Sequence, residues 1–185
     1  MKKLFVSIFI AVMTVFAVFA ADPIEGYWMS YDDETNEITA GWKFYINSKG
    51  QMEAVIVYSP ECDVTTLADE CKGLKPIKDF PIAGEFTKMK VLYDTPWIFG
   101  LEKKSEGVWE NGIIIDCGEG KKYNCKVTFA PADGKKYKVD TLIMRGSIGP
   151  IGVNQLWLRP DDEVVKTLKV RARGITDFID MIEKK

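Results

Sequence analysis

Four cysteines are the residues of this sequence best suited to chemistry, because thiols bind metals or form disulfides. A four-thiolate zinc site needs close pairs such as Cys-x-x-Cys, whereas neighbouring cysteines here lie eight or more positions apart. We therefore expect no metal site. In an oxidising compartment an even number of cysteines favours disulfides, and four allow three pairings. We favour Cys62–Cys71, which would close a polar loop, and Cys117–Cys125, which would clip a hairpin.

The 185 residues include no histidine. This excludes Ser-His-Asp and Cys-His catalysis, histidine-ligated zinc and the usual general base near neutral pH. Two carboxylates can hydrolyse glycosides when they face each other across a cleft, although exposed acidic turns are far more frequent. We therefore predict that the protein is not an enzyme and uses no cofactor. The carboxylates considered are Asp32, Asp33, Glu34, Asp116 and Glu119.

Two segments could contact a partner. The stretch RGSIGPIG at residues 145–152 could cradle an anion, but it lacks the P-loop lysine, and a glycine-rich strand bend is commoner. The polar loop from Pro60 to Asp79 begins where a proline ends a strand, and loops on a rigid scaffold often carry recognition. We expect the glycines to be structural and regard the loop as a candidate lid or contact surface.

The first twenty residues have the features of an export signal. Lys2 and Lys3 precede an apolar run from Leu4 to Phe19, and Ala20 suits cleavage by signal peptidase. The alternative is an uncleaved membrane anchor, but the run is at the short end for a span, which needs roughly 20 residues. We predict that residues 1–20 are a signal peptide, that the protein is periplasmic or secreted, and that it does not stay inserted in a membrane.

Cleavage after residue 20 of 185 would leave 165 residues, a size typical of one domain. Without Lys2 and Lys3, the 25 basic residues become 23 against 27 acidic ones, a formal charge of −4. The basic residues are scattered, so we expect no nucleic-acid partner.

Between short turns, apolar and polar residues alternate with a period of two, which is typical of half-buried strands. In one strand Trp42, Phe44 and Ile46 share a face, and in another Tyr123, Val127 and Phe129 do so. About eight antiparallel strands with no helix between them predict an all-β sandwich or barrel. Besides the strands around 42–46 and 123–129, we expect 26–31, 51–58, 87–93, 107–116, 136–145 and 153–159, whereas TPWIFGL at 95–101 is ambiguous between strand and loop.

After Pro160 the pattern changes to helical spacing. Asp161 is a candidate N-cap, and the acidic residues that follow suit the positive end of a helix. Beyond Gly174, Ile175, Phe178, Ile179 and Ile182 fall on one apolar stripe. We predict a barrel domain over 21–160 and an amphipathic helical segment over 161–185, packed on the barrel wall.

Six short motifs, in this order, resemble a bacterial exported family known as domain of unknown function 2147. The match would run from Gly26 to Arg159, nearly the whole mature domain. The family is similar in fold to lipocalins and related calycins, so the resemblance implies an eight-stranded lipocalin-like barrel. The motifs are GYW at 26–28, CKGLKPIKDFPIAG at 71–84, WENGIIID at 109–116, GKKYNCKV at 120–127, RGSIG at 145–149 and QLWLR at 155–159.

The resemblance also implies a role for Gly26, Trp28 and Arg159. In calycins a Gly-x-Trp motif begins the first strand, and the tryptophan packs under the barrel against an arginine near the last strand. A closed barrel must be sealed at its narrow end, and an indole covered by a guanidinium does this well. We expect this trio to be structural.

Two functions remain open. The leading hypothesis is a binding protein for a small, largely apolar molecule held in the barrel. The alternative is a cell-envelope interaction module with a filled barrel and a recognition loop, because eight strands leave an interior that side chains can just fill. The residues expected to line the interior are Trp42, Phe44, Ile46, Tyr123, Val127, Phe129 and Trp157.

Overall fold

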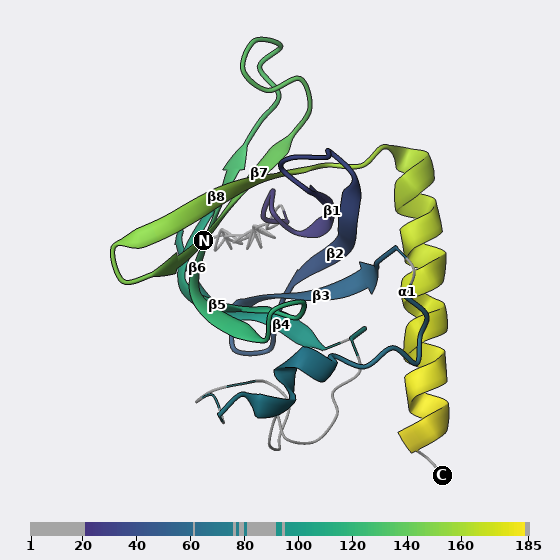
Figure 1. Ribbon diagram of the computed structural model, residues 1–185. Helices are drawn as coiled ribbons and strands as arrows, with labels where there is room; N and C mark the ends of the chain where they lie inside the picture. Colours follow the sequence, from purple (N-terminus) through teal and green to yellow (C-terminus); the bar gives the residue numbers. More distant parts are fainter. Residues whose placement is uncertain are drawn as a thin grey trace, which may run out of the picture.

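The computed structural model describes residues 21–60, 62–75, 77, 80, 92–93 and 95–183, without the side chains of 72, 73 and 178–183. Eight strands form a closed barrel, and one long helix lies against its outside (Figure 1). The predicted all-β class, with eight antiparallel strands and a C-terminal helix, is confirmed. The predicted signal peptide, residues 1–20, lies outside the described residues.

Each strand pairs in antiparallel fashion with the next one along the chain, and β8 closes the barrel by pairing with β1. This last seam is short, and its register joins Met29 to Leu158. Closure leaves no strand of the barrel without two neighbours, which removes the exposed edges of an open sheet. The strands are β1 Gly26–Tyr31, β2 Ile38–Ile46, β3 Met52–Tyr58, β4 Pro96–Ser105, β5 Val108–Asp116, β6 Lys121–Ala130, β7 Thr141–Ile148 and β8 Ile151–Leu158.

The fourth strand is not the one that the sequence predicts. The TPWIFGL segment belongs to β4, between β3 and β5, whereas the described end of the predicted strand 87–93, Leu92 and Tyr93, forms a bend and a turn. The first four residues of β4 are all buried. A strand covered on both faces has no alternation, and this is why its pattern is ambiguous.

The strand predicted at 136–145 begins later than expected, at Thr141. The Asp133 carboxylate accepts hydrogen bonds from the backbone N–H groups of Lys135 and Tyr137, at 2.8 and 2.9 Å. These bonds hold a compact turn, so the backbone donors of this stretch are used locally instead of in a ladder.

The C-terminal helix α1 spans Asp162–Glu183 and runs through Gly174 without a break. Asp161 is its N-cap, because its carboxylate accepts a hydrogen bond of 2.9 Å from the backbone N–H of Val164. The helix packs on β3, where Leu168 is buried with Val55 and Val57 (Figure 1). Of the predicted stripe, Ile175 is buried, and the side chains of Phe178, Ile179 and Ile182 lie outside the described part.

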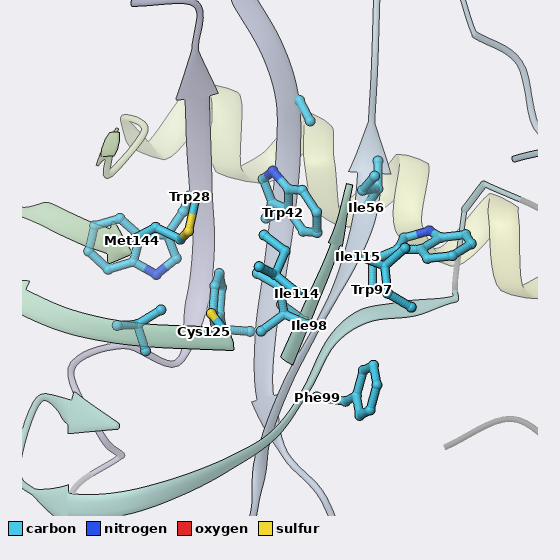
Figure 2. Packing of buried hydrophobic residues seen from close by; sticks show 14 of the residues in the cluster. Trp28, Trp42, Ile56, Trp97, Ile98, Phe99, Ile114, Ile115, Cys125 and Met144 are labelled. Carbon is cyan, nitrogen blue, oxygen red and sulfur yellow. The ribbon is translucent and has the colours of Figure 1, made fainter. Parts of the chain in front are cut away.

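Strand direction gives the barrel two different ends. The floor carries residues 22–25, the start of β1 and the end of β8, while the mouth carries the β5–β6 and β7–β8 turns. Between them lies a core of large side chains contributed by every strand, including Trp28, Ile98, Ile114 and Met144 (Figure 2).

Candidate functional site

The floor is sealed by Trp28, which is fully buried. Its indole N–H donates a hydrogen bond of 2.7 Å to the carbonyl oxygen of Ile24. The guanidinium of Arg159 lies over the indole, 4.0 Å from the ring centroid, and also donates to the carbonyl oxygen of Pro23. Asp140 forms an ion pair of 3.6 Å with the same guanidinium. The apolar plug and its cationic cover therefore join the start of the barrel to its end.

Gly26 permits this arrangement. Its φ of +110° is a conformation that residues with a side chain rarely adopt. A Cβ at this position would lie 3.5 Å from a terminal nitrogen of Arg159, an ordinary contact, so the backbone conformation and not lack of space favours glycine here. Gly26, Trp28 and Arg159 thus form one structural unit at the floor.

Above the core, the mouth opens into a cavity of about 840 Å³. One wall consists of Trp42 and Trp157, whose rings are stacked with centroids 4.9 Å apart and planes 19° apart. Other parts of the lining come from the ends of β5 and β7 and from residues 62–68. A cavity of this size matches the range of small-molecule sites, which is roughly 300–1,000 Å³.

The polar groups of the cavity are few and mostly paired. The indole N–H of Trp42 donates to the hydroxyl of Ser30, and that of Trp157 donates to the side-chain oxygen of Gln155, both at 3.2 Å. Ser30 also shares a hydrogen bond of 2.7 Å with the hydroxyl of Thr39. Because the indole N–H groups are already satisfied, the tryptophans offer apolar ring surface to a ligand.

The seven residues predicted to line the interior fall into three groups. Trp42, Tyr123 and Trp157 line the cavity. Phe44 and Val127 are buried in the core below it, and Phe129 packs edge-on against Trp28 at the floor, with centroids 6.2 Å apart. The prediction for Ile46 is wrong. It is 39% exposed, because it is the last residue of β2 and lies beside the turn at the floor.

Sequence reasoning missed several lining residues. Ser30, Thr39 and Met144 line the cavity near the mouth, and Ala68 reaches it from the β3–β4 connection. Ser30 and Thr39 are polar and carry no signal of an apolar site. The contribution of Ala68 depends on how a long connection folds back over the mouth, which strand periodicity does not encode.

The four cysteines, all of which are described, are free thiols in the structure, so neither predicted disulfide is present. The Cys117–Cys125 pairing is wrong for a geometric reason. Cys125 lies opposite Gly112, five residues before Cys117 on β5, or about 16 Å at the usual rise of a strand. A disulfide needs Cα atoms within about 7 Å. The thiol of Cys71 contacts that of Cys117.

Two of the acidic residues considered for catalysis, Asp32 and Asp116, cap turns. The carboxylate of Asp32 accepts the backbone N–H groups of Thr35 and Glu34, and these bonds lower the pKa of Asp32. Asp116 accepts those of Gly118 and Glu119 at the mouth. Across the described ranges, no group of three potential ligands is placed to hold a metal ion. Nor does any helix in that part of the chain have the length and apolarity to span a membrane.

The glycine-rich stretch 145–152 forms the end of β7, a turn and the start of β8. The guanidinium of Arg145 donates to the side-chain oxygen of Asn154 across the hairpin, at 3.1 Å. A Cβ on Gly152 would lie 2.7 Å from that of Ser147. The glycines of the stretch 145–152 therefore allow the two strands to pack closely and the chain to turn.

Comparison with known proteins identifies a similar fold and a matching family. The fold is similar to that of a protein from the human pathogen Helicobacter pylori that is described as belonging to the lipocalin family. The TM-score is 0.57 at 15% identity, and the likeness covers 84% of this chain and 99% of that one. No curated protein matches the chain. Residues 26–159 match the family described as "Uncharacterized protein conserved in bacteria (DUF2147)". The chain therefore belongs to the DUF2147 family, with a barrel of lipocalin type.

Proposed function

We propose that the barrel cavity binds a small, largely apolar molecule and does not transform it. The observation that carries the proposal is the cavity of about 840 Å³ at the mouth, which has two stacked tryptophans as one wall. A core filled to the mouth would instead favour the alternative, an interaction module. The lack of histidine supports binding without chemistry.

The rim of the cavity supports the same ligand class. Ile148, Ile151 and Val153 on the β7–β8 hairpin line the cavity, yet they are 63%, 78% and 66% exposed. Exposed apolar groups that adjoin a cavity are typical of ligand-binding grooves. An apolar molecule that enters here would bury part of this rim, which adds to its binding free energy.

The test is a fluorescence titration of the mature protein with hydrophobic dyes, fatty acids and aromatic metabolites, followed through the tryptophans at the cavity wall. We expect saturable binding for at least one apolar probe. The variant Gly146→Leu would fill the cavity, because Gly146 lines it and a Cβ there meets only ordinary contacts at 3.7 Å or more. We expect this variant to weaken binding at least tenfold.

Thr128→Leu is the matched control, since it adds bulk on the face of β6 opposite the buried Val127 and should leave binding unchanged. Absence of saturable binding across the whole panel would contradict the proposal. It would favour the envelope interaction module, with the loop from Pro60 to Asp79 as the surface to test next.

We also propose that the protein is exported, with residues 1–20 removed, because of the charged start and apolar run of that segment. The intact mass of protein from the periplasm or medium should correspond to a chain that begins at Ala21. A full-length mass in the membrane fraction would contradict export by a cleaved signal.

A further inference from the structure

The segment 62–75 is held on two sides at the mouth of the barrel. On one side, the guanidinium of Arg171 on α1 donates a hydrogen bond of 3.2 Å to the carbonyl oxygen of Cys62. On the other, its short 3₁₀ helix, Asp69–Gly73, lies against the β5–β6 turn. Ala68 and its neighbours contribute to the cavity lining, so the position of this segment sets the shape of the cavity.

The contact with the β5–β6 turn is tight. A Cβ on Gly120 would overlap the carbonyl oxygen of Glu70, so the turn approaches the 3₁₀ helix as closely as a backbone can. At the same contact the thiols of Cys71 and Cys117 lie within hydrogen-bonding reach of each other. Two backbones and two thiols thus meet at one point.

We propose that Cys71 and Cys117 form a disulfide that fastens the segment 62–75 to the β5–β6 turn and fixes one wall of the cavity. Cys117 and Ala68 both line that cavity, so the bond would hold two parts of its lining together. This proposal rests on contacts within the chain and stands whether or not a ligand binds.

The remaining cysteines are placed differently. Cys125 is buried in the core, about 16 Å along the hairpin from Cys117 by strand geometry. Cys62 lines the cavity, with its carbonyl oxygen bound to Arg171. Of the two contacting thiols, Cys71 is the better nucleophile for exchange, since its hydrogen bond with Cys117 lowers the pKa of Cys71, whereas burial raises the pKa of Cys117. The thiolate is the reactive form.

The oxidant that the reaction needs is an organic disulfide, such as oxidised glutathione or the disulfide of an exchange protein. The two cysteine thiols lose two protons and two electrons as the S–S bond forms between them. The oxidant gains both, and its own S–S bond breaks to give two thiols. Exchange proceeds through a mixed disulfide, which the second cysteine of the pair resolves.

Peptide mapping tests the pairing. The full-length mature protein is equilibrated with defined ratios of reduced and oxidised glutathione, alkylated, digested without reduction and analysed by mass spectrometry. We expect a linked peptide pair containing Cys71 and Cys117, with Cys62 and Cys125 alkylated once the chain is unfolded. Four alkylated cysteines at every ratio, or Cys71 linked mainly to Cys62, would overturn the proposal.

Variants sharpen the test. Cys62→Ser should still form the bond, whereas Cys71→Ser and Cys117→Ser should each leave the other cysteine of the pair alkylated. Gly120→Ala should push the segment away from the turn and lower the equilibrium constant for oxidation at least tenfold. Gly134→Ala is the matched control, because Gly134 has a similar φ of +69° but nothing within 4 Å of the new Cβ. Equal oxidation of these two glycine variants would contradict the contact on which the proposal rests.

Hydrogen exchange gives a readout that does not depend on mapping. The backbone N–H groups of Cys71 and Leu74 bond within the segment, at 3.0 and 3.1 Å. We expect these amides to exchange at least tenfold more slowly in the oxidised protein than after reduction. Identical exchange in both states would show that the segment is not fastened by the bond.

Discussion

At the floor of the barrel, Arg159 is a half-buried cation whose charge is matched on several sides. Burial lowers its pKa, and the opposing effect of Asp140 is smaller. The indole of Trp28, the carbonyl oxygen of Pro23 and the Asp140 carboxylate together offset the loss of water around the guanidinium. The residues of the floor are therefore coupled, because removing Trp28 or Asp140 would take from the guanidinium of Arg159 one of the groups that compensate its burial.

Trp28→Ala should lower the free energy of unfolding by about 3–5 kcal/mol, the usual effect of deleting a large buried aromatic side chain. Arg159→Ala should also destabilise the protein, though by less. Lys136→Ala is the control, because Lys136 also lies over a ring, that of Tyr137, at 4.9 Å, but at an exposed site. The midpoints of urea unfolding compare the stability of the three variants. A floor variant no more destabilised than the Lys136 variant would show that the floor does not hold the barrel together.

Cys125 should make stability depend on alkaline pH. Burial raises its pKa from 9.0 to about 12. Between these values the unfolded chain releases the proton while the folded protein retains it, so stability is complete below pH 9 and declines as pH rises. The decline is about 1.4 kcal/mol per pH unit, or about 4 kcal/mol in all. Urea midpoints between pH 8 and 11 should fall more steeply for the native chain than for Cys125→Ala, and parallel slopes would contradict the burial effect.

Among the elements, α1 covers an outer face of the barrel that would otherwise be apolar and exposed. Leu168 is buried with Tyr27, Met29, Val55 and Val57, all from β1 and β3. Further along, Arg171 lies over the rings of Tyr58 and Tyr93, at 5.2 and 5.7 Å, and binds the carbonyl oxygen of Cys62. The helix therefore stabilises both the barrel wall and the base of the segment at the mouth.

Leu168→Ala should lower the free energy of unfolding by about 2–5 kcal/mol, because it opens a cavity between α1 and β3. Val170→Ala is a control on the same helix, since Val170 is 73% exposed whereas Leu168 is 3% exposed. Thermal unfolding followed by circular dichroism compares the two. Equal midpoints would mean that the helix does not pack on the barrel in solution.

A strand with one wet face is readable from its alternation. β6 covers the predicted residues 123–129, because the exposed Asn124 and Lys126 alternate with the buried Cys125 and Val127. β1 also keeps its predicted bounds, although its four middle residues are buried, because the GYW motif marks its start. β4 was ambiguous because its first residues are buried on both faces. The late start of β7 depends on the hydrogen bonds of Asp133, which hold the preceding residues in a turn. The periodicity of the sequence does not show whether such residues form a turn or pair in a sheet.

For the molecule as a whole, closure could be predicted from motifs, whereas the cavity could not. Trp28 and Arg159 stand at either end of the strand-rich sequence, and a tryptophan–arginine pair at such positions indicates a sealed floor. Whether the mouth is hollow depends on side-chain volumes summed over eight strands and on where residues 62–68 fold back. Phe44 and Trp42 are neighbours on one strand face, yet Phe44 fills the core and Trp42 lines empty space.

The proposed disulfide has a consequence for global stability. A bond from Cys71 to Cys117 closes a loop of about 45 residues, and loop-closure entropy then predicts about 4 kcal/mol of stabilisation. Reduction should lower the urea midpoint of the oxidised protein by a matching amount. The double variant Cys71→Ser, Cys117→Ser should show no response to reductant. A midpoint that is the same before and after reduction would contradict the predicted gain.

The pairing of the first strand with the last one fixes the order of events as the chain is made. β1 emerges early from the ribosome, but its partner at the seam, Leu158, and the cover of Trp28, Arg159, follow about 130 residues later. Hairpins such as β2–β3 can form beforehand because their contacts are local, whereas the seam is a contact of large sequence separation. The barrel thus cannot close during synthesis of its first seven strands. Until the last strand is released, Trp28 stays uncovered, and the incomplete chain remains open to chaperones and proteases.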